Sequence, residues 1–273
     1  MTKGINVLSL FDGMSCGSLA LDEAGIEVNK YYASEIDPYA IKVAQNNYPD
    51  SIQLGGVGNW WDWDIDLGNI DLLIGGSPCQ GFSYAGKQLA FDDPRSKLFF
   101  NYVDILNCIK ELNPDVLFML ENVKMKPEYL EIITNTLGVS KVLINSNLVS
   151  AQNRLRYYWA NWLVKPPADK GVLLKHIIEG AVKSKAKTLR VGGRGSPEGS
   201  KQEWDGVYTH TNKSAGVCYR KLSVIECERL QTVPDNYTDG VSDTQRYKML
   251  GNGWTVDVIA HILKQMPLEE TIA

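Results

Sequence analysis

The stretch that decides the fold is residues 5–17, INVLSLFDGMSCG, an apolar run followed at once by a polar loop with two glycines. Residues 5–10 predict a buried β-strand, and the segment from Ser18 to Ala24 predicts a helix that ends at Gly25. A strand, a glycine-bearing loop and a helix in this order favour an α/β domain with a parallel sheet. The glycines do not form the pattern G-x-G-x-x-G, which disfavours a Rossmann dehydrogenase.

The same alternation of strands and helices continues along the chain. The predicted strands are 31–34, 70–74, 116–120, 141–149 and 157–161, and the predicted helices are 38–47, 97–112, 224–230 and 255–266. The two last strands are expected to pair antiparallel. We therefore predict an α/β fold with a mostly parallel sheet, helices on both faces and a small lobe inserted before the last helix.

The composition limits the class of protein. The chain has 273 residues, of which 44% are apolar and 22% are charged, as in ordinary globular proteins, so disorder, collagen and coiled coil are poor descriptions. An apolar run of about 18 residues is absent, and the start lacks the shape of a signal peptide, so we expect no membrane and a cytoplasmic location. Five cysteines without a C-x-x-C pair, together with three histidines, indicate neither a disulfide framework nor a metal site.

The net charge of −4 hides an uneven distribution. Residues 141–221 carry 15 Lys and Arg against 5 Asp and Glu, whereas the rest of the chain carries 13 against 27. A basic face of this kind is typical of a nucleic-acid partner, and a solvated surface is the alternative. The segment 165–221 is also rich in lysine and glycine, with an evident loop around 191–200.

The loop 11–17 and a carboxylate point to a cofactor. Ligands of open α/β sheets bind at the carboxyl ends of strands, where this loop lies. Glu35 ends the strand 31–34 and follows Gly17 by 18 residues. This spacing favours a nucleoside-bearing cofactor whose ribose hydroxyls donate to Glu35, and a tight turn that packs a helix on a strand is the alternative.

A thiol and a second carboxylate are expected at the same edge. Residues 75–83, GGSPCQGFS, follow a buried strand and place Cys79 after a proline in a polar turn, although most intracellular cysteines are small core residues. The loop that continues to Arg95 has the composition of a mobile lid. Glu121 ends the strand 116–120 and is a candidate acid, with a helix-capping role as the alternative.

A pair of arginines follows later in the chain. Residues 152–156, QNRLR, place Gln152, Arg154 and Arg156 on one face of an extended segment. Arginines on one face can bind a carboxylate or a phosphate through paired hydrogen bonds, and structural salt bridges are the alternative.

Together these motifs resemble those of the DNA (cytosine-5)-methyltransferases, in particular the small phage and bacterial ones. The likeness covers nearly the whole chain in family order, and the loop 11–17 is also similar to that of the vertebrate de novo enzymes. The motifs are FDGMSCG at 11–17, EID at 35–37, PCQ at 78–80, ENV at 121–123, QNRLR at 152–156, the segment 220–231 with LS at 222–223 and ECERLQ at 226–231, and GNG at 251–253.

The resemblance implies S-adenosylmethionine as methyl donor and a cytosine flipped from double-stranded DNA as acceptor. It implies Cys79 as the nucleophile that adds to C6, Glu121 as the acid at N3, Arg156 at the base carbonyl, and Arg154 at a phosphate or at the neighbouring loop. The fold would be the Rossmann-like methyltransferase fold. Residues 1–164 and 242–273 would form the catalytic domain, and residues 165–241 the target-recognition lobe.

The resemblance also implies the binding residues. The cofactor set comprises Phe11, Asp12, Gly13, Met14, Gly17, Glu35, Ile36, Asp37, Val57, Pro78, Asn252, Gly253 and Trp254. The DNA-binding set comprises Gln80, Ser83, Arg95, Gln152 and Arg194, in a protein that acts as a monomer without a metal. In one departure, Gly56 stands where the family usually has an acidic residue that accepts from the adenine amino group, which removes one expected hydrogen bond.

Two other functions remain open. A cytosine methyltransferase that acts on tRNA is compatible with the short lobe, and methylation assays on duplex DNA and tRNA would separate the two. A catalytically silent DNA-binding homologue would retain the scaffold without affinity for the donor. Gly56 favours that alternative weakly, whereas Cys79, Glu121, Arg154 and Arg156 disfavour it.

Overall fold

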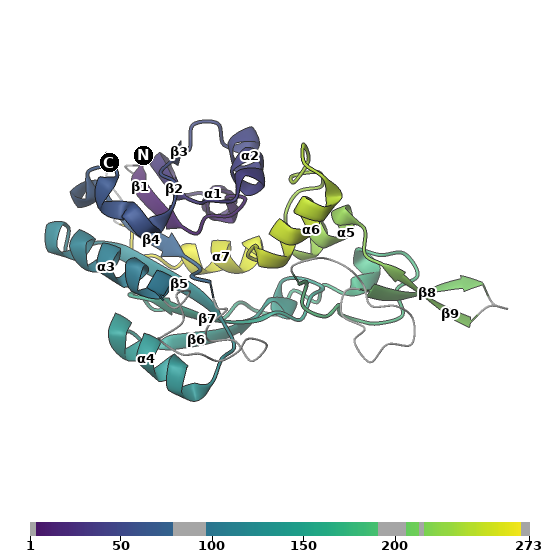
Figure 1. Cartoon of the computed structure of the whole chain (residues 1–273). Helices are drawn as coiled ribbons and strands as arrows, with labels where there is room; N and C mark the ends of the chain where they lie inside the picture. The colour runs from purple at the N-terminus through teal and green to yellow at the C-terminus, as the bar shows by residue number, and fades with distance from the viewer. Residues whose placement is uncertain (1–3, 79–96, 191–205, 213–215, 269–273) are drawn as a thin grey trace, which may run out of the picture.

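The computed structural model describes residues 4–78, 97–190, 206–212 and 216–268, and it has the expected α/β architecture (Figure 1). Seven strands form one sheet: β1 Ile5–Leu10, β2 Val28–Ser34, β3 Ile52–Gln53, β4 Leu72–Gly75, β5 Leu117–Val123, β6 Lys141–Asn145 and β7 Leu155–Ala160. The helices are α1 Cys16–Ala24, α2 Pro38–Asn47, α3 Lys97–Leu112, α4 Pro127–Leu137, α5 Val224–Leu230, α6 Asp243–Asn252 and α7 Val256–Leu263.

The sheet is mostly parallel, as predicted. Its strand order is β3-β2-β1-β4-β5-β7-β6, and β7 runs antiparallel to both of its neighbours. The prediction that the two late strands pair antiparallel is therefore confirmed. Because β7 reverses direction, its first residues lie at the edge where β1, β2, β4 and β5 end, which brings Arg156 opposite Val123.

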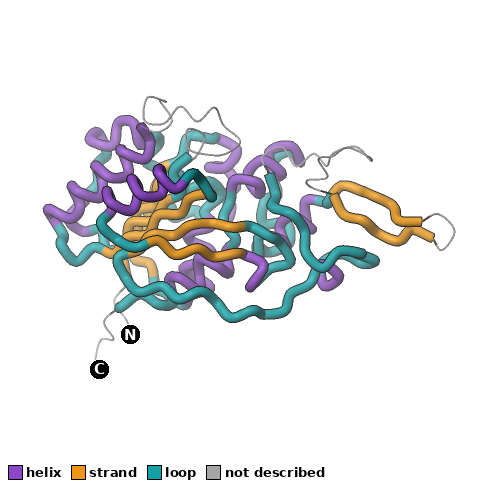
Figure 2. The backbone as a smooth tube through the Cα atoms, turned by 90° about the horizontal axis from the view of Figure 1, so that it is seen from below, coloured by secondary structure: helices purple, strands orange, loops and turns teal. Residues whose placement is uncertain are grey.

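Helices cover both faces of the sheet, and the strands alternate between two hydrophobic clusters (Figure 2). In β1, Val7 belongs to the cluster that contains α1 and α7, whereas Leu8 belongs to the cluster that contains α3 and α4. Tyr158 and Trp159 divide in the same way in β7. This period of two is the expected pattern for a sheet that is buried on both faces.

Some boundaries differ from the prediction. Strand β5 continues through Glu121 and Asn122 to Val123, because these residues pair with β7 instead of starting a loop. Helix α1 begins at Cys16, two residues before the predicted start. Helices α4 and α6 were not predicted, although a proline near the start of α4 and the left-handed Gly138 at its end are ordinary helix signals.

The region predicted as a lobe, 165–241, contains a hairpin of β8 Gly206–Asn212 and β9 Gly216–Lys221, which extends away from the large sheet (Figure 1). Leu230 and Tyr237, in the same range, are buried in the cluster that contains α1 and α7. The division into lobe and catalytic domain stays a prediction. Every helix in the described ranges lacks the length and apolarity that crossing a membrane requires.

Gly17 allows α1 to pack closely on the sheet, which yields a test of the core. A Cβ atom at this position would lie 2.5 Å from the Tyr31 hydroxyl and 2.7 Å from Ile74 Cδ1. We predict that Gly17→Ala lowers the free energy of unfolding by about 1–3 kcal/mol, as overpacking of a core does. Thermal denaturation measures this change. Gly58→Ala is the control, because its Cβ would meet nothing within 4 Å, and equal melting temperatures for the two variants would contradict the prediction.

Candidate active site

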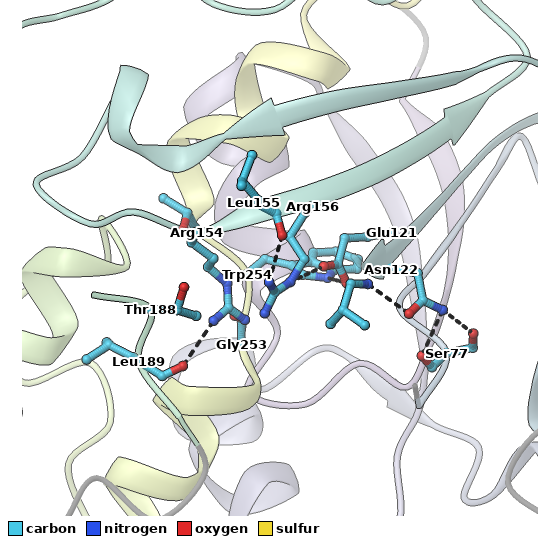
Figure 3. A network of polar contacts seen from close by, with 12 residues as sticks. Ser77, Glu121, Asn122, Arg154, Leu155, Arg156, Thr188, Leu189, Gly253 and Trp254 are labelled. Carbon is cyan, nitrogen blue, oxygen red and sulfur yellow. Dashed lines mark hydrogen bonds and ion pairs between the residues drawn. The ribbon is translucent and has the colours of Figure 1, made fainter. Parts of the chain in front are cut away.

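The candidate site is built around the Glu121 carboxylate of β5, which is 8% exposed (Figure 3). Oε1 lies 2.8 Å from Nε of Arg156, and Oε2 accepts a hydrogen bond of 3.1 Å from Nε1 of Trp254. Glu121 pairs across the sheet with Tyr158, so Arg156, two residues away on the same face of β7, is its diagonal neighbour. The carboxylate is thus fixed by two donors from distant parts of the chain.

The loop after β4 passes directly against this carboxylate. A Cβ atom on Gly76 would lie 3.0 Å from both Glu121 Oε2 and Trp254 Nε1, so the backbone can approach only because residue 76 has no side chain. The neighbouring Ser77 Oγ accepts a hydrogen bond of 3.1 Å from Nδ2 of the buried Asn122. The predicted residues Cys79, Gln80, Ser83, Arg95 and Arg194 lie outside the described residues.

Arg154 stabilises the turn that carries Trp254. Its guanidinium is 2% exposed and donates to the backbone carbonyls of Gly253 at 2.8 Å, Gly251 at 3.3 Å and Leu189 at 3.4 Å. Burial lowers the pKa of Arg154 to about 9, and the nearby charge of Arg156 adds to this effect. Of the two predicted positions, phosphate or loop, the structure places Arg154 at the loop.

Gln152, which the sequence predicts to contact DNA, is fully buried, and this contact stays a prediction. Its Nε2 donates to Leu230 O at 3.1 Å and to Gln231 Oε1 at 3.2 Å, and its Oε1 accepts from the Leu189 N–H at 2.8 Å. Alternation along 152–156 predicted which residues share a face, but it did not reveal that residues 186–189 cover that face at Gln152. The structure therefore does not support a DNA contact for this residue.

The predicted cofactor loop and the end of β2 are joined by Glu35. The carboxylate accepts backbone hydrogen bonds from Gly13 at 2.8 Å, Ile36 at 2.7 Å and Asp37 at 2.9 Å. An ionised carboxylate offers about four lone-pair sites, so these three bonds leave capacity for a ligand hydroxyl. Ile36 is 76% exposed and presents an apolar side chain beside this carboxylate.

The loop itself has an unusual backbone. Phe11, Gly13 and Ser15 all have positive φ angles, between 58° and 63°. The buried Asp12 stabilises this conformation by accepting hydrogen bonds from Ser15 Oγ at 2.5 Å and the Tyr31 hydroxyl at 2.6 Å. Burial raises the pKa of Asp12, and the hydrogen bonds from Ser15 and Tyr31 oppose that rise. Met14, in the middle of the loop, is buried.

The two halves of the predicted cofactor set meet at Gly253. A Cβ atom there would lie 3.0 Å from Met14 Cε and 3.3 Å from Cys16 Sγ, so residues 11–17 and 252–254 pack together. Asn252 is exposed, whereas Trp254 is buried.

The remaining predicted cofactor residues lie along the same edge. Val57 is buried, Pro78 is half-buried, and Asp37 caps α2 and is bound by Lys248. Gly17 faces Tyr31 and Ile74, so the contact shown for it is with the protein core. A Cβ atom on Gly56, the departure from the family pattern, would lie 3.1 Å from Ile36 Cγ2, so a side chain at position 56 would press against Ile36.

A surface hollow of about 350 Å³ adjoins Arg156. Its lining residues are Val123, Lys124, Asn153, Leu155, Arg156 and Thr188. Lys124 and Thr188 were missed by the sequence reasoning, although Lys124 follows the Glu-Asn-Val motif directly. In contrast, Lys185 of the basic segment donates to three backbone carbonyls, those of Asn147, Ser150 and Val172, and so stabilises the protein itself.

A metal site is not part of this arrangement. Within the described ranges, no group of three or more His, Cys, Asp and Glu side chains is placed to hold a metal ion.

Comparison with known proteins identifies one family along the chain. The profile described as C-5 cytosine-specific DNA methylase matches residues 5–160 and 175–267. The type II methyltransferase M1.ScrFI of Lactococcus lactis subsp. cremoris is 31% identical over 97% of this chain and 78% of its own length. The type II methyltransferase M.HhaI of Haemophilus parahaemolyticus is 26% identical over 95% of this chain and 93% of its own.

Two solved structures with a similar fold are of eukaryotic proteins. The S. pombe Dnmt2 methyltransferase superimposes with a TM-score of 0.71 and 16% identity, over 96% of this chain and 98% of that one. A mutant DNMT2 of Spodoptera frugiperda gives a TM-score of 0.70 and 19% identity, over 96% and 99% of the two chains. At this level of identity the likeness concerns the fold.

The thiol within the loop 11–17 should be unreactive. Burial raises the pKa of Cys16 to about 12, so at pH 8 about one molecule in 10⁴ carries the thiolate that alkylation requires. We predict that iodoacetamide leaves Cys16 unmodified in the folded protein at pH 8 and modifies it in guanidinium chloride. Mass spectrometry of peptides checks this, with the partly exposed Cys108 as the control. Equal modification of both thiols in the folded protein would contradict the prediction.

Proposed function

The chain belongs to the C-5 cytosine-specific DNA methylase family, and from that premise we propose that it methylates C5 of a cytosine flipped out of duplex DNA. The observation that carries the proposal is the buried Glu121 carboxylate, which Arg156 and Trp254 hold against the loop that leads to Cys79. A fixed acid beside the start of a cysteine-bearing loop is the arrangement that addition to a pyrimidine needs.

Cys79 is the proposed nucleophile. C5 of cytosine is a weak nucleophile, because its electrons are delocalised in the ring. A thiolate that adds to C6 forms an S–C6 bond and moves the electron pair of the C5–C6 double bond, so that C5 becomes nucleophilic. After transfer, loss of the C5 proton restores the double bond and expels the thiolate. Cysteine suits both steps, since it attacks as a thiolate and leaves readily.

Glu121 is the proposed acid. Addition at C6 builds negative charge on the ring, and a proton or hydrogen bond that the protonated form of Glu121 donates to N3 offsets it. Two bonds from Arg156 and Trp254 hold the Glu121 carboxylate in place before the base arrives. Preorganised groups of this kind contribute more than mobile ones, because they need no rearrangement during the reaction. Arg156 is also placed to contact the base carbonyl from the hollow that it lines.

The residues at the ends of β1 and β2 fit S-adenosylmethionine. This donor supplies a methyl group bound to a positively charged sulfur. The exposed Ile36 offers an apolar contact for adenine, and Glu35 keeps capacity for a ribose hydroxyl. A Cβ atom on Gly13 would meet nothing within 4 Å, so the backbone there is open to a ligand. The proposed contacts also include Phe11, Asp12, Met14, Gly17, Asp37, Val57, Pro78 and residues 252–254.

Duplex DNA is the proposed substrate. Lys124 and Arg156 line the same hollow, and the basic excess of residues 141–221 would neutralise phosphates, which makes binding dependent on salt. Gln80, Ser83 and Arg95, which follow Cys79 in the sequence, are proposed to contact DNA near the flipped base. Arg194 is proposed to contact DNA from the lobe. M1.ScrFI and M.HhaI, both named type II methyltransferases, support this substrate.

Methyl transfer from labelled donor tests the function. The protein should produce 5-methylcytosine in duplex DNA and little in tRNA, as measured by mass spectrometry of the digested nucleosides. Methylation of tRNA without methylation of duplex DNA would show that tRNA, and not DNA, is the substrate. Absence of both products, together with no measurable donor binding by calorimetry, would favour a silent DNA-binding homologue.

Removal of the proposed nucleophile should abolish turnover. Cys79→Ala is expected to form no 5-methylcytosine above background, because the thiolate that forms the S–C6 bond is removed, while its affinity for duplex DNA stays within about threefold of the wild type. Radiolabelled methyl transfer and gel-shift titration measure the two quantities. Appreciable transfer by this variant would rule out the covalent route.

Neutralising the proposed acid should slow the reaction without unfolding the protein. Glu121→Gln retains the shape of the side chain but loses the charge that pairs with Arg156, and we expect the rate of methyl transfer to fall about 10²–10⁴-fold. Single-turnover kinetics measure this rate. Glu128→Gln, at an exposed position of α4, is the control and should react like the wild type. An unchanged rate for Glu121→Gln would remove Glu121 from the mechanism.

A further inference from the structure

The segment between α5 and α6, residues 232–240, has no role in the function proposed above, yet its conformation is tightly specified. Thr232, Asn236 and Gly240 have positive φ angles of 54°, 65° and 91°. Such angles are unfavourable for residues other than glycine, so two of the three persist only because surrounding contacts stabilise them.

A buried network around Glu228 supplies those contacts. The Glu228 side chain is 0% exposed and accepts hydrogen bonds from the backbone of Asn236 at 2.8 Å and of Thr238 at 2.9 Å. The Thr238 hydroxyl donates to the same carboxylate at 2.5 Å, and Nη2 of Arg246 lies 3.1 Å away. Arg246 Nε in turn donates to the Thr238 hydroxyl at 2.8 Å. The residues on both sides of Tyr237 are therefore fixed.

The Tyr237 side chain reaches the predicted cofactor loop. Its hydroxyl donates a 2.8 Å hydrogen bond to the backbone carbonyl of Met14, although the two residues are 223 positions apart. Met14 lies between Gly13 and Ser15, both of which have positive φ angles. Ser15 forms no side-chain hydrogen bond that caps α1, because its hydroxyl donates to Asp12. Asp12 thus supports the loop from within, and the Tyr237 hydroxyl supports it from outside, in addition to Glu35.

Further contacts fix this segment relative to α2, which begins beside Glu35. The Asn47 side chain donates to Tyr237 O at 3.0 Å, and Lys42 donates to Gly240 O at 2.9 Å. Lys248 of α6 lies 2.7 Å from Asp37, the residue that caps α2. These bonds fix Tyr237 relative to α2, the helix that follows Glu35, which is the proposed ribose contact. The position of Tyr237 is therefore set relative to the proposed donor site at the ends of β1 and β2.

We propose that Tyr237 is a positioning residue, whose hydroxyl holds the Met14 carbonyl and keeps the loop 11–17 in the conformation that binds the methyl donor. This inference rests on the proposed function, because it assigns the loop to the donor. The bonded Tyr237 hydroxyl lowers the free energy of the binding conformation and leaves the chemical step to Cys79 and Glu121. The expected signature is a weaker donor affinity at an unchanged rate of transfer under saturation.

The test compares two tyrosines that each donate one hydrogen bond to the α1 region. Tyr237→Phe retains the ring and removes the bond to Met14, whereas Tyr48→Phe removes a 2.7 Å bond to Asp22, a residue of α1 outside the loop. We expect the dissociation constant for S-adenosylmethionine, measured by calorimetry, to rise about three- to tenfold for Tyr237→Phe, as for one lost hydrogen bond. For Tyr48→Phe it should stay within twofold. Steady-state kinetics should show a raised KM for the donor and an unchanged kcat for Tyr237→Phe.

Other results would each overturn the proposed role of Tyr237. Wild-type donor affinity in Tyr237→Phe would overturn the inference and leave the proposed function intact. An equal loss in both variants, or a fall in kcat at saturating donor without a change in KM, would assign Tyr237 a purely structural role and also overturn it. A wild-type protein that does not bind the donor would overturn the proposed function, and this inference with it.

Discussion

The arrangement of the site depends on one constraint, a buried carboxylate held between an arginine and an indole. Glu121 is 8% exposed, and a charge in such a place is costly unless it is paired and hydrogen-bonded. Arg156 and Trp254 satisfy this need, one at each carboxylate oxygen. Their positions follow from the fold, since only an antiparallel β7 brings Arg156 to the edge where β5 ends.

Trp254 can donate to Glu121 only if the turn at residues 251–254 is held in place. The carbonyl of Gly253, the residue before Trp254, accepts hydrogen bonds from Arg154 at 2.8 Å and from Gln231 at 3.1 Å. Gly253 also packs against Met14. The same turn therefore orients the indole that binds Glu121 and closes one side of the proposed donor site. A displacement of this turn would disturb both functions, and the hydrogen bonds from the buried Arg154 to its carbonyls resist such a displacement.

Much of this could be predicted from local sequence patterns. The helices predicted at 38–47 and 224–230 are confirmed as α2 and α5, and Asp37 and Ser223, which cap them, are short-range signals. Alternation along 152–156 predicted that Arg154 and Arg156 share a face. It could not predict that Arg154 turns to the carbonyls of 251–253, or that Gln152 is covered by residues 186–189, because those contacts join segments far apart in the sequence. The close approach at Gly76 and the bond from Tyr237 to Met14 have the same long-range origin.

The most direct measurement is a crystal structure of the protein after reaction of S-adenosylmethionine with duplex DNA that contains 5-fluorocytosine at the target. Once the methyl group has been transferred to C5, the fluorine there cannot leave as a proton does, so the covalent adduct should accumulate. The account predicts a bond between Cys79 Sγ and C6 of an extruded cytosine, with Glu121 within hydrogen-bond distance of N3 and still bound to Arg156 and Trp254. A target base that remains stacked in the helix, or a Glu121 carboxylate turned away from N3, would contradict it.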